Sequence, residues 1–534
     1  MSVFLLHTPL LFMLFVLKYI MYNFVFKINW RKSHMYYNST RNNNVKIDSA
    51  LAIKTGISAD GGLFVPNNIP QVDMEFICSL ADKSYKQRAV EILGKFLTDY
   101  TTEELMDCAV NAYDDKKFGS SDTAPLKKLN DNTHILELWH GPTCAFKDMA
   151  LQILPHLLTK AIKKTGENKK VVILVATSGD TGKAALEGFK DVEGTGIVVF
   201  YPNNGVSKIQ QLQMATQEGS NVGVVAVNGN FDDAQTGVKV IFTDEQYKAE
   251  LKDKGVMLSS ANSINWGRLA PQIVYYFSAY CDMLKNDEIK PGDKINIVVP
   301  TGNFGNILAA YYAKTMGLPV NKLICASNIN NVLTDFINTG VYDKNRVFHT
   351  TISPSMDILI SSNLERLLYH LSDGNDALIC DYMQKLSGDG SYKVDDNILL
   401  KIKDLFYADC ADDGETKQTI SDVYNKYGYT ADTHTAVAIN VYEKYLKDTG
   451  DNTKTVIAST ANPYKFNESV ISAIAGNGEC EGLDEFELLD KLCEISKLEI
   501  PHSLKSLKVK PVRFDVVCEK QDMKDVATDF LNNI

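Results

Sequence analysis

One lysine of this chain lies in a setting that could make its amine reactive. Lys147 follows a tight Gly-Pro turn and opens an apolar helical stretch that runs through Met149, Leu151 and Leu154. The positive end of a helix and a dry environment both disfavour an ammonium group and lower its pKa. A lysine amine that is neutral near pH 7 can form an imine and later move protons. Taken alone, the residue could also be a solvated lysine in a first helical turn.

A glycine-rich loop has the composition of a phosphate-binding site. It lies between an apolar run at 295–300 and a helical stretch at 307–315, and it consists of Gly302, Asn303, Phe304, Gly305 and Asn306. Glycines let backbone N–H groups turn inward at a helix N-terminus, where they bind one phosphate. A dinucleotide site fits badly, because G-x-G-x-x-G is absent and the next apolar run ends in Asn328 rather than an acid. A glycine-rich turn without a ligand is the other interpretation.

A third loop offers N–H groups to an anion. It contains Ser178, Gly179, Asp180 and Thr181. A P-loop is excluded, because that motif needs Gly where Thr177 stands and Ser or Thr where Ala184 stands. Asp180 or Thr181 could simply cap a helix. The same helix end could bind the carboxylate of an amino acid.

The elements that position these loops alternate along the chain. Seven short apolar runs are separated by helical stretches, and we expect them to be strands: Ile135–Trp139, Val171–Ala176, Gly196–Tyr201, Val222–Val227, Ile295–Pro300, Leu323–Ser327 and Thr455–Ser459. Strands interleaved with helices predict an α/β fold, with parallel sheets covered on both faces. Ligands of such sheets bind at the carboxyl ends of the strands, where the three loops lie.

Three other segments of the sequence lack this alternation of apolar runs and helical stretches. Residues 35–130 show mainly helical periodicity and predict a leading domain, before a catalytic region at 131–534. Within the latter, 401–448 is predicted to be a peripheral helical insertion. Residues 1–34 are mostly apolar, and their length would span a bilayer. They are interpreted as a membrane anchor, an unusual targeting segment, or upstream sequence before a start at Met35, and in each case as lying outside the catalytic fold.

Composition and charge narrow the classes of function. The 534 residues are 45% hydrophobic and 23% charged, as in ordinary globular proteins, and the net charge of −11 is spread without a long basic block. We therefore expect no nucleic-acid partner. The ten cysteines form no C-x-x-C pair and the nine histidines form no H-E-x-x-H motif, so no metal site is predicted. Reduced thiols in a cytoplasmic protein are the expected state.

The sequence around these residues resembles threonine synthases of the longer, microbial and fungal type. The similar motifs occur in order along the chain: YNSTR at 37–41, DGGLFVP at 60–66, HGPTCAFKD at 140–148, SSANSIN at 259–265, SPSMD at 353–357 and ASTANP at 458–463. Two positions depart from the pattern. Cys144 stands where an aliphatic residue is common, and Asn462 stands where His is expected.

The resemblance implies a cofactor and a fold. It implies a tryptophan-synthase-β-like fold of two parallel-sheet subdomains that binds pyridoxal 5'-phosphate, held by Lys147 as a Schiff base. Loop 302–306 would bind the cofactor phosphate, and Thr460 would meet the pyridine nitrogen. A hydroxyl does not force that nitrogen to carry a proton, as a carboxylate would.

The resemblance also implies a substrate, O-phospho-L-homoserine, that becomes L-threonine and phosphate by γ-elimination and β-addition of water. Loop 178–181 would bind its carboxylate, and Ser263, Asn265, Arg268 and possibly Lys208 its phosphate. A related phospho-lyase that releases a keto acid is the first alternative. A nucleotide-binding protein without this cofactor, or a membrane-anchored structural protein, are the others. The oligomeric state is not predicted.

Overall fold

The computed structural model describes residues 34–119, 122–177, 179–203 and 205–532. The apolar segment at 1–33 and Ser178 therefore lie outside the described residues. Within the described ranges, no helix has both the length and the apolar character that crossing a bilayer would need.

The leading region combines a small sheet with several helices. Its antiparallel sheet has the strand order β2-β1-β3. Capping boxes begin two of the helices, where Ser84 pairs with Gln87 and Thr101 with Glu104, so local sequence fixes where these helices start. The elements are β1 (Tyr37–Ser39), β2 (Asn42–Ile47), α2 (Ser49–Thr55), β3 (Phe64–Pro66), α3 (Met74–Ser79), α4 (Tyr85–Phe96), α5 (Thr102–Ala112) and α6 (Asp115–Phe118). The prediction of a mainly helical leading region is confirmed, while its boundary at residue 130 stays a prediction.

The larger of two main sheets has six strands in the order β14-β11-β10-β15-β5-β4. All neighbours pair parallel except β4 and β5. Both faces are covered, which explains why a strand such as 295–300 is apolar and buried along its whole length. The strands are β4 (Leu126–Lys128), β5 (Thr133–Glu137), β10 (Ile295–Pro300), β11 (Val320–Ser327), β14 (Phe406–Cys410) and β15 (Thr455–Ser459).

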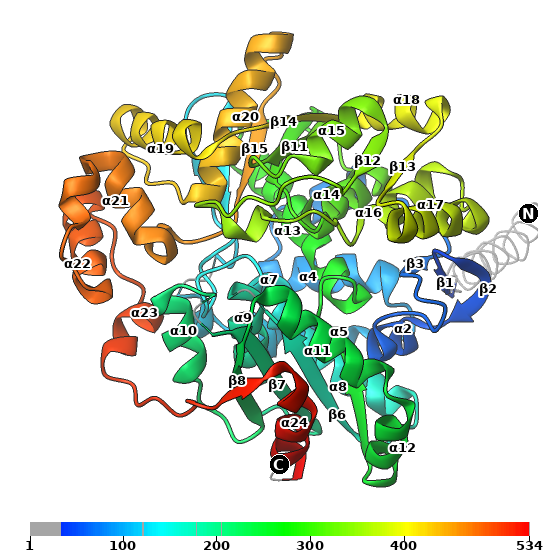
Figure 1. The fold of residues 1–534 in the computed structure, drawn as a ribbon. Helices are drawn as coiled ribbons and strands as arrows, with labels where there is room; N and C mark the ends of the chain where they lie inside the picture. Colours follow the sequence, from blue (N-terminus) through cyan, green and yellow to red (C-terminus); the bar gives the residue numbers. More distant parts are fainter. Residues whose placement is uncertain (1–33, 120–121, 178, 204, 533–534) are drawn as a thin grey trace, which may run out of the picture.

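The second main sheet has five parallel strands in the order β16-β8-β7-β6-β9. Figure 1 shows it in the lower half of the molecule, with the six-stranded sheet above it and α7, α9 and α13 between them. Its strands are β6 (Lys170–Ala176), β7 (Thr195–Pro202), β8 (Val222–Asn228), β9 (Val256–Ser259) and β16 (Val517–Glu519). The predicted α/β fold with two parallel-sheet subdomains is thus confirmed.

Helices cover the sheets and fill the space between them. The 20-residue helix α13 is buried at nearly every position, as expected of a helix packed on several sides. The helices are α7 (Asp148–Leu151), α8 (Leu154–Lys164), α9 (Asp180–Phe189), α10 (Lys208–Ala215), α11 (Phe231–Thr243), α12 (Glu245–Asp253), α13 (Trp266–Lys285), α14 (Gly305–Met316), α15 (Val332–Thr339), α16 (Leu364–Leu371), α17 (Asp376–Gly388), α18 (Asp396–Leu405), α19 (Asp413–Tyr427), α20 (Thr433–Thr449), α21 (Asn467–Ala475), α22 (Glu485–Ser496), α23 (His502–Lys505) and α24 (Met523–Asn532). A hairpin of β12 (Val341–Asp343) with β13 (Ser391–Lys393) and five 3-10 turns, of which η1 (Pro354–Met356) and η2 (Pro463–Phe466) matter below, complete the elements.

Each of the seven predicted strands is present. Two have the predicted bounds, and the first lies two residues earlier than predicted, at 133–137. In the two main sheets, β4, β9, β14 and β16 were not predicted; they are three to five residues long, shorter than the predicted runs or interrupted by polar residues. The short strands β1, β2, β3, β12 and β13 outside those sheets were not predicted either.

The segment 401–448, predicted to be a peripheral helical insertion, is largely helical but also contains a strand. Residues 406–410 form β14, which pairs in register with β11 at the edge of the six-stranded sheet. Helix α20 packs on that sheet, and its residues Ala436, Val437 and Ala438 are fully buried. The strand between α18 and α19 thus joins the segment to the core.

Candidate active site

The predicted loops come together at the carboxyl ends of the strands. The loop after β5 and the loop after β15 pair at Ala145 and Ala461, and the Phe146 N–H donates to the Thr460 carbonyl at 2.8 Å. Ser355, in η1, lies between Lys147 and the glycine-rich loop after β10. Its hydroxyl oxygen is 3.3 Å from Lys147 Nζ, and its carbonyl oxygen lies where a side chain on Gly302 would begin.

Lys147 stands immediately before α7 and is 9% exposed. Its Nζ lies 3.5 Å from Asp180 Oδ2 and 4.9 Å from the centre of the Phe146 ring. Burial lowers the pKa of the Lys147 amine below its usual value. The Asp180 carboxylate opposes this shift, whereas the positive charges of Lys465 and Arg268 add to it. The setting therefore shifts the amine toward the neutral form that imine formation requires.

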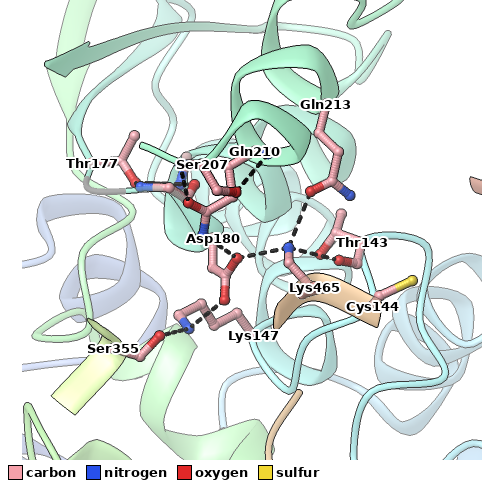
Figure 2. Close-up of polar contacts among 12 residues, drawn as sticks. Thr143, Cys144, Lys147, Thr177, Asp180, Ser207, Gln210, Gln213, Ser355 and Lys465 are labelled. Atoms are coloured by element: carbon pink, nitrogen blue, oxygen red, sulfur yellow. Dashed lines mark hydrogen bonds and ion pairs between the residues drawn. The ribbon is translucent and has the colours of Figure 1, made fainter. Parts of the chain in front are cut away.

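Asp180 does not cap its helix. Gly179 stands at the N-cap of α9 with φ 137°, a conformation that favours glycine, and a side chain there would collide with Gln210. The Asp180 carboxylate points instead into the site, toward Lys147 and Lys465 (Figure 2). Burial alone would raise the pKa of Asp180, but these two ammonium groups outweigh it and hold the pKa well below its usual range.

The glycine-rich loop forms the start of α14. Phe304 occupies the N-cap in a left-handed conformation, φ 64°, which turns the loop into the helix. A Cβ on Gly302 would lie 2.7 Å from the Ser355 carbonyl oxygen, so only glycine fits. The Asn303 carbonyl accepts hydrogen bonds from the backbone and the side chain of Asn363. The loop is thus fixed from outside, and the first N–H groups of α14 have no intrahelical partners.

Asn306 adds an amide to this helix end. Its Oδ1 accepts hydrogen bonds from the hydroxyls of Tyr275, at 2.8 Å, and Tyr276. Its Nδ2 is buried and has no hydrogen-bond partner in the described part of the chain. A buried donor without a partner is unfavourable by roughly 1–3 kcal/mol, which a bound acceptor would relieve.

These groups fit pyridoxal phosphate. Free N–H groups at a helix end, an unpartnered amide donor and a loop without side chains at Gly302 and Gly305 suit a phosphate monoester. Lys147, which Ser355 links to that loop, suits an aldehyde. Thr460 follows β15, is 6% exposed, and is tied through its carbonyl to Phe146, beside the lysine.

The residues predicted to bind the substrate phosphate differ in their surroundings. Arg268 is buried, its Nη1 donates to the Ala261 carbonyl, and no carboxylate within the described ranges pairs with it. Burial lowers its pKa to about 10. Ser263 lies 3.3 Å from the Ser362 hydroxyl, which in turn donates to Asn303.

The other two predicted phosphate donors already have partners. Asn265 caps α13, accepting from the Gly267 N–H, and its Nδ2 donates to the Ile53 carbonyl. Lys208 is exposed at the start of α10 and donates to Gln211 on the same helix. Thr181, predicted to bind the substrate carboxylate, is half-buried in the first turn of α9.

The two departures from the family pattern also have structural roles. Asn462 caps η2, where its side chain accepts from the Tyr464 N–H. Cys144 is buried with φ 61°, and its Sγ lies 3.4 Å from the Ser503 hydroxyl. Burial raises the pKa of this thiol to about 11. All ten cysteines are free thiols.

Sequence analysis missed several residues at the site, chiefly Ser355, Gln210 and Lys465. Gln210 Nε2 donates to Asp180 Oδ1 at 3.0 Å, and Lys465 Nζ lies 2.6 Å from the same oxygen. Ser355 belongs to the SPSMD motif, and Lys465 lies two residues beyond ASTANP. The motifs pointed to these segments but not to the side chains that turn inward.

Comparison with known proteins gives three consecutive family matches. Residues 36–113 match "Threonine synthase N terminus", residues 123–392 match "Pyridoxal-phosphate dependent enzyme", and residues 435–528 match "Threonine synthase, C-terminal". The matches cover the leading region, most of both sheets and the C-terminal part.

Individual relatives agree with these matches. Human "Threonine synthase-like 1" is 41% identical over 433 residues, which cover 79% of this chain and 57% of that protein, so the chain spans little more than half of its length. Threonine synthase of Pseudomonas aeruginosa is 38% identical over 446 residues, 83% of this chain and 91% of the bacterial protein. A crystal structure of threonine synthase from Brucella melitensis with bound pyridoxal phosphate has a TM-score of 0.82 at 35% identity, covering 93% of this chain and 99% of that one.

Proposed function

The chain belongs to the threonine synthase family of pyridoxal-phosphate-dependent enzymes, and from this premise we propose that it converts O-phospho-L-homoserine and water to L-threonine and phosphate. The proposal rests on one observation above the others. Arg268 carries a buried positive charge beside Lys147, with no carboxylate pairing it in the described part of the chain. A buried charge without a partner is unfavourable, so this site is built to receive an anion. A phosphate on the substrate supplies that anion.

The other residues divide the binding of cofactor and substrate between them. Loop 302–306 holds the cofactor phosphate at the start of α14, and Lys147 forms the covalent link to the cofactor. The N–H groups at the start of α9 bind the substrate carboxylate, while Arg268 and Ser263 bind its phosphate. Thr460 would bind the pyridine nitrogen through its hydroxyl. When bound, the cofactor supplies an electron sink for the charge that develops at Cα.

Lys147 is also the group that moves protons. With substrate bound, its neutral amine would take one proton from Cα and one from Cβ. After phosphate has left Cγ, it would return one proton at Cγ and, once water has added at Cβ, one at Cα. Arg268 and Ser263 stabilise the phosphate as it leaves Cγ. Burial of the site keeps bulk water away, so that a single water adds at Cβ. The Lys147 amine would then displace the amine of threonine and release the product.

Product analysis with purified protein tests the proposal. O-phospho-L-homoserine is added, and phosphate, threonine, keto acid and ammonia are measured together. We expect threonine and phosphate in equal amounts. Phosphate accompanied by keto acid and ammonia instead would identify a phospho-lyase that uses the same binding groups, and absence of all products, in protein with a full complement of cofactor, would contradict the substrate.

A further inference from the structure

A second buried lysine holds the acid beside Lys147. Lys465, in η2, has a side chain that is 0% exposed, and its Nζ has three partners: Asp180 Oδ1 at 2.6 Å, Gln213 Oε1 at 3.1 Å and the Thr143 carbonyl at 3.2 Å. Figure 2 shows the ammonium between these groups. An ammonium has three hydrogens, so this one is fully used.

The contact also joins the two sheets. Lys465 and Thr143 follow β15 and β5 of the six-stranded sheet, whereas Asp180 and Gln213 lie on α9 and α10, beside the five-stranded sheet. The two sheets are therefore tied together at the carboxylate that faces Lys147.

Asp180 thereby meets two ammonium groups at unequal distances. One oxygen lies 2.6 Å from Lys465 and also accepts from Gln210, while the other lies 3.5 Å from Lys147. The nearer lysine pairs the carboxylate, and the farther one makes only a long contact. If Lys147 loses its charge, Asp180 still has a buried ionic partner, and no unpaired charge is left behind.

We infer that Lys465 is a positioning residue, which holds Asp180 as a paired carboxylate so that Lys147 can release its proton and join the cofactor. In the joining step the neutral Nζ adds to the aldehyde carbon, and loss of one water leaves a C=N bond. A protonated Nζ has no lone pair for this step. The inference uses the proposed role of Lys147 but not the proposed reaction.

Other charged and titratable groups lie near Lys147, on the elements that pack around it. Arg268 on α13 is positive and opposes its protonation. Asp148 on α7 is turned away and accepts from the N–H and the hydroxyl of Thr143. Behind Ser355, His434 Nε2 accepts from the Ser355 N–H, so its other nitrogen carries the ring hydrogen, which faces Asp432. Asp180 is thus the carboxylate in contact with Lys147, and Lys465 is the cation that pairs it.

The test measures cofactor attachment without substrate. Cofactor-free protein is mixed with pyridoxal phosphate between pH 6 and 10, and visible absorbance and borohydride-trapped cofactor are followed. In Lys465→Met, Asp180 keeps Lys147 as its only ammonium partner, so the pH midpoint of attachment should rise by about one to three units. Below the midpoint, each further pH unit should lower the rate of cofactor attachment about tenfold, because the neutral fraction of Lys147 falls tenfold. Asp180→Asn should lower the pH midpoint of attachment. The midpoint of the D180N/K465M double variant should differ little from that of D180N, whereas the midpoint of K465M should differ much from that of the wild type.

Three controls separate this effect from general damage. Lys183→Met removes a lysine on α9 whose side chain is 11% exposed and which pairs with Glu187 and Gln217; it should leave the midpoint unchanged. Lys465→Arg keeps the charge and should stay near wild type. Lys147→Ala shows how much of the visible absorbance and of the borohydride-trapped cofactor depends on Lys147, without a measurement of turnover.

Several results would overturn the inference. They are an unchanged midpoint in folded K465M, an unchanged midpoint in D180N, and a D180N/K465M double variant that titrates as high as K465M. The double variant has no buried unpaired carboxylate, so it should fold even if K465M does not. In that case the pH midpoints of D180N and of the double variant are compared, and a clearly higher midpoint in the double variant would contradict the inference. Failure to make threonine, with these midpoints as expected, would contradict the proposed function alone.

Discussion

The two sides of the site use different chemistry to hold their ligand groups. On one side Lys147, Asp180 and Lys465 form a chain of buried charges, in which each charge alters the protonation of the next. On the other side Asn306 is held by the hydroxyls of Tyr275 and Tyr276, which are neutral. Burial raises the pKa of both tyrosines well above its usual value, so this side does not titrate near neutrality.

The difference follows from what each side must do. A group that forms and breaks a covalent bond must change its protonation, and neighbouring charges control that change. A group that binds a phosphate throughout the reaction needs fixed donors, and fixed dipoles provide them without changes in protonation. Mutations on the ionic side should therefore change pH dependence, and mutations on the neutral side should change affinity alone.

The largest effect is expected for Lys147→Ala on the ionic side. It removes both the covalent link and the proton carrier, so turnover should fall by at least about 10³-fold. Borohydride treatment should trap no cofactor, and absorbance should show weakly bound cofactor only. A folded variant that still traps one cofactor per chain would contradict the assignment.

Arg268→Gln comes next, because it removes a charge from the substrate site. The KM for O-phospho-L-homoserine should rise about 10- to 100-fold, as expected for a lost charged hydrogen bond. Inhibition by inorganic phosphate should weaken in parallel, whereas saturating cofactor content should not change. Arg88→Gln is the matched control, since Arg88 is a buried arginine on α4 that pairs with Asp282. A raised KM with unchanged phosphate inhibition would place Arg268 elsewhere.

Tyr276→Phe tests the neutral side. It removes one donor to Asn306, so affinity for pyridoxal phosphate should fall about 3- to 10-fold, with the pH midpoint of attachment unchanged. Equilibrium binding of pyridoxal, which lacks the phosphate, should be unaffected. Tyr280→Phe, whose hydroxyl donates to the Asp293 carbonyl instead, is the control. Equal losses for both ligands would mean that the tyrosine supports the fold rather than the phosphate loop.

The smallest effect is expected for Ser207→Ala. Ser207 caps α10, the helix that carries Gln210 to Asp180, and its loss should lower the free energy of unfolding by about 1 kcal/mol. Ser84→Ala removes a similar capping box on α4, away from the site, and should lower it by a similar amount. Denaturant titration measures the free energy of unfolding of both variants. A much larger decrease in S207A than in S84A would show that the Ser207 cap supports the ionic network as well.

The sequence by itself determined the class of fold and the segments of the site. Continuous apolar runs predicted seven parallel strands, because a strand buried on both faces must be apolar throughout. Glycines at positions where no side chain fits, and a lysine opening a helix, are local features. They made Lys147 and loop 302–306 candidates, and the resemblance of the surrounding motifs to threonine synthases implied their roles.

Only the tertiary structure decided which side chains meet. Lys465 lies hundreds of residues beyond Lys147 and Asp180 in the chain, and the packing of two sheets brings the three together. No periodicity of the sequence encodes a contact of that kind. Asp180 looked like a helix cap because capping is a local interaction, yet two buried ammonium groups attract its carboxylate more strongly than the backbone does. For the same reason β14 was missed: its place is fixed by pairing with β11 across the sheet, rather than by its own five residues.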